Sequence, residues 1–277
     1  MNKIIGFIGC GNMAKAMIGG LIKSNLIAPE RIIVSAKTKE TLEKVEKDYG
    51  INVTLDNKKV ARESDYLILA VKPYMHELVL EEIKNEIEER VIVITIAAGI
   101  SIDYMKKNLG KDILVVKAMP NTPAMVGEGV TALSFDDRII DEEMREEIIS
   151  IFNSFGRTEI LDENLMDGFT ALCGSSPAYV YMMIEAMADG GVLQGIPRKQ
   201  AYKMAAQAVL GAAKMVLDTE IHPGELKDNV CSPKGTTIEA VAKLEEMGFR
   251  SAIIEAMRVC AEKSRQCTIT KDKKQSY

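Results

Sequence analysis

A glycine-rich turn near the N-terminus constrains the fold more than any other feature of this sequence. Gly9, Gly11 and Ala14 form a G-x-G-x-x-G/A pattern between a strand-like run at residues 4–8 and a helix-like segment at residues 13–24. In this context the pattern binds the pyrophosphate of a dinucleotide, because the glycines allow a tight turn and the helix N-terminus attracts phosphate. The alternative is a glycine turn that binds no ligand.

Apolar runs and helix-like segments alternate along the first half of the chain. The runs are mostly continuous and β-branched, as in strands that are buried on both faces of a parallel sheet. They lie at residues 4–8, 32–35, 66–71, 91–96, 113–117 and 130–134, with helices predicted at 13–24, 39–49, 76–85, 102–108 and 141–155. This alternation predicts an α/β domain of the Rossmann type, with a doubly wound parallel sheet.

After Leu161 the strand-like runs disappear, and the sequence predicts helices only. We therefore expect a Rossmann domain at residues 1–161 and an all-α domain at residues 162–277. The segment 178–193 is apolar nearly all round, which predicts a fully buried helix. It would be buried either in a dimer interface or at the centre of one subunit.

The end of the second predicted strand indicates which dinucleotide binds. NAD-binding sites usually carry an acidic residue there, about 20 residues after the turn, to bond the ribose 2′-hydroxyl. Here Ser35, Ala36, Lys37 and Thr38 occupy the place, and the first carboxylate is Glu40. Hydroxyl groups and one cation would instead hold a 2′-phosphate. The sequence favours NADPH, with NADH as the alternative.

Distinctive loops follow three further predicted strands, at residues 69–73, 95–99 and 120–123. Ligands of open α/β sheets bind beyond the carboxyl ends of the strands, so these loops are candidates for the nicotinamide site. Ala97 and Ala98 are small enough to let a flat ring lie close. Ordinary turn chemistry is the alternative for each loop taken alone.

A second candidate binding segment lies in the helical half. Pro233, followed by Gly235, Thr236 and Thr237, predicts the start of a helix. Backbone N–H groups at that start, with the hydroxyls of Ser232 and both threonines, would form a carboxylate pocket without any arginine. The alternative is an ordinary helix cap.

Composition argues against several other classes of protein. The 277 residues carry a formal net charge of −5 and no basic cluster, so neither nucleic acid nor an anionic membrane is expected as a partner. The five cysteines form no C-x-x-C pair and the two histidines lack clustered partners, so we expect no disulfide framework and no metal site. Without a signal-like N-terminus or a membrane-spanning run, a cytoplasmic protein is expected.

The sequence resembles the pyrroline-5-carboxylate reductases over nearly its whole length. The resemblance is carried by residues 6–14, 70–73, 119–123, 174–179, 211–215, 232–237 and 248–250, and Ser-Pro-x-Gly-Thr-Thr at 232–237 is highly specific. It implies reduction of Δ1-pyrroline-5-carboxylate to L-proline with NADPH, the last step of proline biosynthesis. It further implies that the helical domain binds substrate and interlocks with its twin in a homodimer, which in some members assembles into a larger ring.

The resemblance also implies which residues bind. Together with Lys37, Thr38, Ala97 and Ala98 from the loops above, the cofactor residues are Gly9, Cys10, Gly11, Asn12, Met13, Ser35, Asn57, Ala70, Val71, Lys72 and Pro73, with Asn229 between cofactor and substrate. The substrate carboxylate is assigned to Ser232, Gly235, Thr236 and Thr237. Thr237 is also the candidate catalytic residue, whose hydroxyl would bond the imine nitrogen or relay a proton from water.

Two positions depart from the family pattern, which usually has glycine where this chain has Ser176 and Lys234. Ser176 is expected to cap a long helix that has Pro177 in its first turn. Lys234 either attracts the substrate carboxylate or points to solvent.

Two other functions stay open at this point. A β-hydroxyacid dehydrogenase would use a catalytic lysine in the helical domain, for which Lys203 and Lys214 are available. That function would leave residues 232–237 unexplained. An NADP-sensing protein would keep the cofactor fold without catalysis.

Overall fold

The computed structural model describes residues 1–110, 112–136 and 141–267. The chain divides into two compact units, Met1–Gly174 with Cys260–Tyr277, and Ser175–Val259. This division lies later than the predicted boundary after Leu161. The reason is local packing, because Met166 and Phe169 belong to a small apolar cluster with residues of the sheet.

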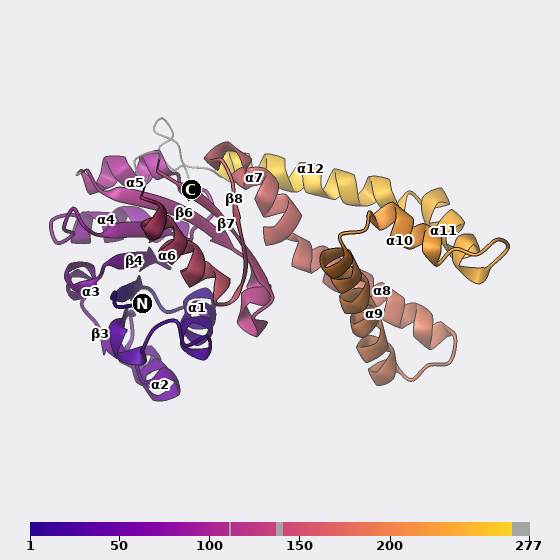
Figure 1. The fold of residues 1–277 in the computed structure, drawn as a ribbon, viewed down its shortest axis with the longest axis horizontal. Helices are drawn as coiled ribbons and strands as arrows, with labels where there is room; N and C mark the ends of the chain where they lie inside the picture. Colours follow the sequence, from indigo (N-terminus) through magenta and orange to yellow (C-terminus); the bar gives the residue numbers. More distant parts are fainter. Residues whose placement is uncertain (111, 137–140, 268–277) are drawn as a thin grey trace. The chain divides into compact units, whose positions relative to one another are not determined.

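The first unit is built on one eight-stranded sheet (Figure 1). Its strands lie in the order β3-β2-β1-β4-β5-β6-β7-β8. Their bounds are β1 (Ile5–Ile8), β2 (Ile32–Ser35), β3 (Asn52–Thr54), β4 (Tyr66–Leu69), β5 (Ile92–Thr95), β6 (Leu114–Pro120), β7 (Gly129–Phe135) and β8 (Gly156–Ile160). All neighbouring strands are parallel except β6 and β7. This order, with the crossover between β3 and β4, confirms the Rossmann prediction.

Helices cover both faces of this sheet, and alternate residues of the inner strands are buried on opposite sides. Ile5 and Phe7 of β1 join a cluster with α1 (Asn12–Lys23), α2 (Lys39–Tyr49) and α6 (Glu142–Asn153). Ile8 joins a second cluster with α3 (Asn57–Glu63), α4 (His76–Ile83) and α5 (Ile102–Leu109). Burial on both faces explains why the central strands are continuously apolar in sequence.

The sheet differs from the prediction in two additional strands, β3 and β8, and in the direction of one strand, β7. β3 and β8 lie at the two edges of the sheet and keep exposed or half-buried polar residues, so they carry no apolar run that a sequence pattern could detect. β7 runs antiparallel to β6 because the connection between them, from Asn121 to Glu128, is a hairpin loop rather than a crossover helix.

The second unit is helical, as predicted. It contains α8 (Ser176–Leu193), α9 (Arg198–Thr219), α10 (Pro223–Asn229), α11 (Thr236–Glu246) and the first part of α12 (Phe249–Cys267). The later part of α12 belongs to the first unit, where Ser264 donates a hydrogen bond to Asp167, just after the start of α7 (Met166–Phe169). None of the helices in the described residues has the length and apolar character needed to cross a membrane.

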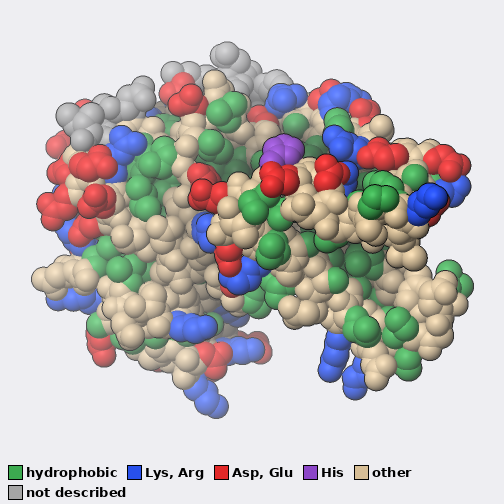
Figure 2. Space-filling view, turned by 45° about the vertical axis from the view of Figure 1, so that its right-hand side comes forward, with side chains coloured by type: hydrophobic (Ala, Val, Ile, Leu, Met, Phe, Trp, Pro, Cys, Tyr) green, Lys and Arg blue, Asp and Glu red, His purple; other side chains and the backbone are tan. Residues whose placement is uncertain are grey.

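Within one chain, α8 is not a buried helix. Ala188 is its only buried residue among those described, whereas Met182 is 70% exposed and Leu193 is 85% exposed. The space-filling view in Figure 2 shows hydrophobic side chains on the outer surface of the molecule. The exposure of α8 contradicts the expectation that it is the central helix of one subunit. The other expectation, that α8 is buried in a dimer interface, stays. Ser176 is the first residue of the helix and makes no side-chain cap to it, so the predicted cap is wrong.

Candidate functional site

The glycine turn joins β1 to α1 at the carboxyl edge of the sheet. Gly9 has a φ of +97°, and a β-carbon there would lie 2.8 Å from the carbonyl oxygen of Ala70. Its N–H donates to the carbonyl of Ser35 at 3.0 Å, which ties the turn to the end of β2. Gly9 is therefore required by the fold itself, because a side chain would strain the backbone and collide with the end of β4.

Gly11 has a different role, because its backbone is extended and unstrained. No other described atom lies within 4 Å of the place that its β-carbon would take, apart from its chain neighbours. It precedes α1, whose first turn has no acidic residue and, within the described chain, no side-chain cap. The first N–H groups of α1 are thus available to an anion, which fits the pyrophosphate of a dinucleotide.

The remaining residues of the turn differ in exposure. Asn12 is exposed, Met13 is half-buried and Cys10 is almost fully buried. Burial raises the pKa of the Cys10 thiol, and nearby Lys15 opposes this in part. The thiol therefore stays protonated and adds no negative charge beside the proposed phosphate site.

The end of β2 is polar and carries no carboxylate. Ser35 is fully buried, and its hydroxyl donates to Asn57 Oδ1 at 2.7 Å. Asn57 Nδ2 donates in turn to Glu82 at 2.8 Å. Lys37 and Thr38 are exposed, and the Thr38 side chain caps α2. Lys37 therefore supplies an exposed cation at this edge, while the Ser35 hydroxyl is hydrogen-bonded to Asn57.

The loops after β4 and β5 begin at the same level as the glycine turn. Leu69 is the register partner of both Ile8 and Thr95, so three strand ends meet at one edge. The predicted cofactor residues of these two loops differ in exposure. Lys72 and Ala98 are exposed, and Ala97 is buried. The others are half-buried: Ala70, Val71 and Pro73. The structure therefore places these loops and the glycine turn at one edge of the sheet.

His76 and Thr95 are two residues of this edge that the sequence argument missed. Both are fully buried, and His76 Nε2 lies 3.1 Å from Thr95 Oγ1. His76 Nδ1 lies 3.2 Å from the carbonyl oxygen of Lys72. The sequence offers one signal for this pair, a histidine directly after the loop that follows β4. That signal does not show that Thr95 is its partner.

Asn121 lies in the third predicted loop, but its side chain is used inside the first unit. Its Nδ2 donates to the carbonyl of Cys173 at 3.0 Å, and its Oδ1 accepts from the N–H of Val130 at 2.9 Å. The bond from Val130 closes the hairpin between β6 and β7, and the bond to Cys173 ties this hairpin to the later segment. Ordinary turn chemistry thus accounts for Asn121 in this loop.

The predicted carboxylate segment of the second unit forms a turn and the start of α11. The Gly235 N–H donates to the Ser232 carbonyl at 3.0 Å, and Lys234 has a φ of +58°. A β-carbon on Gly235 would lie 2.3 Å from Ser232 Oγ and 3.0 Å from the Ser232 carbonyl oxygen, so a larger residue there would displace the Ser232 hydroxyl. No side chain in the described chain caps α11, so its first N–H groups are available to a carboxylate.

The other predicted residues of this unit lie on or beside the same turn. Thr236 and Thr237 are the first two residues of α11, and Thr237 is half-buried. Asn229 is the last residue of α10 and is exposed. Lys214 lies on α9, exposed to solvent, and forms an ion pair with Asp218 at 2.6 Å. The cofactor residues other than Asn229 belong to the first unit, and the substrate residues belong to the second.

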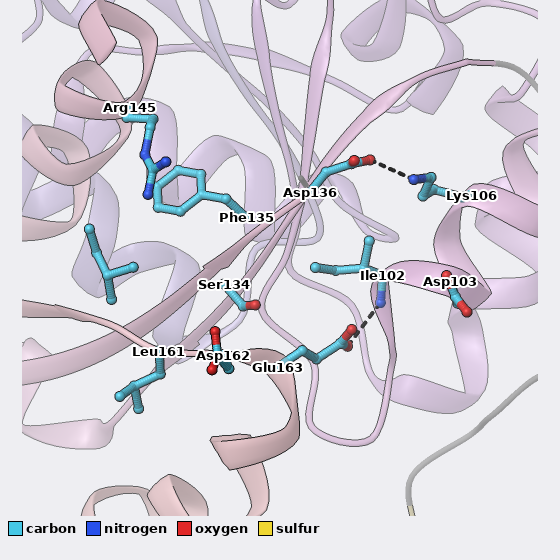
Figure 3. A pocket seen from close by; sticks show the side chains of 11 residues that line it. Ile102, Asp103, Lys106, Ser134, Phe135, Asp136, Arg145, Leu161, Asp162 and Glu163 are labelled. Carbon is cyan, nitrogen blue, oxygen red and sulfur yellow. Dashed lines mark hydrogen bonds and ion pairs between the residues drawn. The ribbon is translucent and has the colours of Figure 1, made fainter. Parts of the chain in front are cut away.

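A separate pocket of about 490 Å³ lies in the first unit, and none of the predicted site residues lines it (Figure 3). Three of its charged groups, Lys106, Asp136 and Glu163, are paired with protein groups. Lys106 Nζ lies 2.9 Å from Asp136, and Glu163 accepts from the Ile102 N–H at 3.0 Å and from the buried Lys117 at 3.2 Å. These pairs join α5, β6 and β7 to the segment after β8, which is a structural role.

Among the residues that the structure describes, no group of three or more His, Cys, Asp or Glu side chains could hold a metal ion. The described cysteines are free thiols.

A Rossmann sheet with an uncapped glycine turn and no acidic residue at the end of β2 is typical of an NADP-dependent oxidoreductase. The family model described as NADP oxidoreductase, coenzyme F420-dependent, matches residues 4–99. The model described as pyrroline-5-carboxylate reductase dimerisation matches residues 163–267. The chain is 48% identical to the pyrroline-5-carboxylate reductase of Escherichia coli over 95% of its length and 98% of the relative. It therefore belongs to the pyrroline-5-carboxylate reductase family.

Solved structures agree with this assignment. A pyrroline-5-carboxylate reductase from Coxiella burnetii superposes with a TM-score of 0.92 at 34% identity, covering 98% of this chain and all of that one. The NADP-bound pyrroline carboxylate reductase of Plasmodium falciparum gives a TM-score of 0.86 at 31% identity, covering 97% and 99% of the two chains. Membership of the family makes the β-hydroxyacid dehydrogenase alternative unnecessary.

Proposed function

We propose that this chain reduces Δ1-pyrroline-5-carboxylate to L-proline with NADPH, which is the last step of proline biosynthesis. The observation that carries the proposal is the 48% identity to a reductase of that name over 95% of the chain, which spans both units. NADPH supplies the hydride, so the protein has to bind, orient and supply a proton.

The first unit holds the cofactor at three places. The first N–H groups of α1, with Gly9 to Met13, hold the pyrophosphate. Lys37 and Thr38 hold the 2′-phosphate, with Asn57 beside them, which favours NADPH over NADH. Ala70 to Pro73, with Ala97 and Ala98, hold the nicotinamide end. The absence of a carboxylate in the loop after β2 supports this selection, because an acidic group there would repel a phosphate.

The second unit holds the substrate. Ser232 and the first N–H groups of α11 bind the carboxylate, with the hydroxyls of Thr236 and Thr237. The family resemblance assigns Asn229 a contact with the bound substrate and cofactor. Lys234 adds one positive charge to the same turn.

Thr237 assists the chemical step at the imine nitrogen. Reduction adds hydride to the imine carbon and a proton to the nitrogen, so the C=N bond becomes a CH–NH single bond. A hydroxyl that donates to the nitrogen polarises the C=N bond, and water is the source of the proton. A threonine hydroxyl is too weak an acid to give up its proton outright, so its role is to polarise and position.

The helical unit is also where two chains join. It exposes large apolar side chains along its helices, and the dimerisation model of the family matches it. We infer a homodimer formed through these helices. A larger ring of dimers and a cytoplasmic location stay predictions, which sedimentation and cell fractionation would test.

The test of the proposed function is a direct assay. The purified chain is mixed with NADPH and pyrroline-5-carboxylate, and the absorbance of the reduced cofactor is followed while proline is measured as the product. Equimolar loss of NADPH and gain of proline is expected. NADPH binding without oxidation would favour an NADP-sensing protein, and oxidation only with hydroxy or semialdehyde acids would favour a dehydrogenase.

Thr237→Ala tests the role of the hydroxyl. The catalytic efficiency, kcat/KM for the imine, is expected to fall by about 100-fold, the lower end for removal of one acid–base or hydrogen-bonding group. Thr237→Ser is the matched control, because it keeps the hydroxyl and is expected to retain most of the activity. A change of less than about twofold in the alanine variant would refute the role.

A further inference from the structure

His76 connects the two loops of the proposed nicotinamide site through hydrogen bonds. It is the first residue of α4, and its side chain has no exposed surface. One ring nitrogen lies 3.2 Å from the Lys72 carbonyl in the loop after β4, and the other lies 3.1 Å from Thr95 Oγ1 at the end of β5. Thr95 Oγ1 also accepts from the Ala97 N–H at 3.3 Å. One side chain therefore contacts one loop directly and the other through Thr95.

The chemistry of the partners sets the direction of these bonds. A carbonyl oxygen only accepts, so the nitrogen beside Lys72 must carry the proton. The other nitrogen of a neutral imidazole is then an acceptor, and it takes the hydroxyl proton of Thr95. The Thr95 oxygen keeps a lone pair for the Ala97 N–H. The chain from Ala97 through Thr95 and His76 to Lys72 leaves no donor unsatisfied, and it holds only while the imidazole is neutral.

Burial keeps the imidazole neutral. It lowers the pKa of His76, and the bonds to the carbonyls of Lys72 and Pro73 oppose this effect only in part. Near neutral pH the ring therefore carries no charge, and it can donate with one nitrogen and accept with the other as the geometry requires.

For a histidine that only filled the core, hydrogen bonds to any buried polar groups would be enough. These partners are the backbone of Lys72 and, through Thr95, the backbone of Ala97, and both loops are assigned to the cofactor. The spacing of the two loops determines where a nicotinamide ring can lie between them.

We propose that His76 is a positioning residue for the cofactor, which holds the loops after β4 and β5 at the spacing that NADPH binding requires. The proposal rests on the proposed function, because it takes these loops as the cofactor site. His76 itself does not touch the cofactor, since it is fully buried.

The experiment measures NADPH affinity by fluorescence titration, with KM values for NADPH and for the imine, in His76→Leu, Thr95→Val and the double variant. Each single variant breaks the same chain of hydrogen bonds, so each is expected to weaken NADPH binding by about five- to tenfold. The double variant should be no weaker than the worse single variant, because the two groups act as one unit. The KM for the imine should change by less than about twofold.

Two further variants separate positioning from packing. His76→Gln keeps a donor and an acceptor, so it is expected to restore most of the NADPH affinity. Ile83→Val trims a fully buried residue of the same helix and should lower the melting temperature without changing that affinity. If His76→Leu does not fold, Thr95→Val carries the test, because valine matches threonine in shape.

The outcomes distinguish this proposal from the proposed function. Unchanged NADPH affinity in Thr95→Val, or equal effects of His76→Leu and Ile83→Val, would overturn the positioning role, as would failure of the unchanged protein to bind NADPH. If the unchanged protein binds NADPH but does not reduce the imine, the proposed function fails, whereas the titrations still decide the role of His76.

Discussion

Lys234 occupies a backbone conformation that most residues avoid. It follows Pro233 in a turn that is closed by the bond from the Gly235 N–H to the Ser232 carbonyl, and its φ is +58°. A proline in the second place and a positive φ in the third are typical of a type II turn, which favours glycine in the third place. Glycine would adopt this conformation without strain, whereas lysine costs about 1 kcal/mol in this chain.

Lys234→Gly is therefore expected to stabilise the protein. The free energy of unfolding should rise by up to about 1 kcal/mol, because glycine adopts a positive φ without strain. Urea denaturation at a fixed protein concentration measures it. Lys243→Gly, in the interior of α11, is the matched control and should lose about 1 kcal/mol. A loss of stability in Lys234→Gly would contradict this account of the turn.

The same variant shows whether the ammonium group of Lys234 serves the substrate. If it attracts the carboxylate, the KM for the imine rises in Lys234→Gly, and the rise shrinks at high salt because the attraction is screened. An unchanged KM would mean that the side chain points to solvent.

At the scale of elements, the turn between β1 and α1 contains two glycines, and the physical reason for glycine differs between the two positions. Gly9 is confined by the end of β4 and by its own positive φ, so the fold requires it. Gly11 has an ordinary φ and free space beside it, so the fold does not. The turn thus separates a glycine needed for folding from one that we assign to the approach of a phosphate.

Gly11→Ala is expected to fold normally and to bind NADPH poorly. Its unfolding free energy should be unchanged or raised by up to about 1 kcal/mol, because alanine reduces the freedom of the unfolded chain. The NADPH dissociation constant should rise by about tenfold or more, because the methyl group takes the space of the phosphate. Calorimetric titration and thermal denaturation measure the two effects.

The control for this turn is Gly9→Ala, which should lose both stability and NADPH binding. If Gly11→Ala binds NADPH as the unchanged protein does, the pyrophosphate does not lie on this turn.

The elements that the sequence predicted and those that it missed differ in burial. β1, β4 and β5 lie inside the sheet, and their apolar runs follow from burial on both faces. β3 and β8 lie at the edges, where one neighbour strand suffices and polar side chains are tolerated. Their pairing depends on the strand beside them, which a local pattern does not contain.

At the scale of the whole molecule, the helical unit lacks a core of its own. Its buried residues among those described in Ser175–Val259 are the small side chains Ala188, Ala201 and Ala205, while larger apolar residues such as Met204 and Leu210 are exposed. The larger apolar side chains of α9 are therefore unburied in one chain. Burial in a second copy resolves this, and it makes stability depend on association.

Met182→Lys tests the dimer. Met182 is 70% exposed on α8 in the single chain, and an ammonium group buried there in an interface would lack a partner. The dimer dissociation constant is expected to rise by about 100-fold or more, since an unpaired buried charge costs at least about 3 kcal/mol. Sedimentation velocity over a range of protein concentrations measures it.

Asn85→Lys is the control for charge, because Asn85 is an exposed residue of the first unit. This variant should remain dimeric. A Met182→Lys variant that stays dimeric at the same concentrations would show that α8 lies outside the interface.

The sequence by itself determined the features that depend on neighbouring residues. These features are local patterns: the glycine turn, the continuous central strands and the helix start after Pro233. The residues that form each of them are close together along the chain, so a short stretch of sequence contains the whole pattern. The tertiary structure alone decided which distant residues meet. His76 and Thr95 are 19 residues apart and meet because β4 and β5 pair in one register. Strand register, edge position and burial depend on the packing energy of the whole sheet. A short segment of sequence does not contain that information.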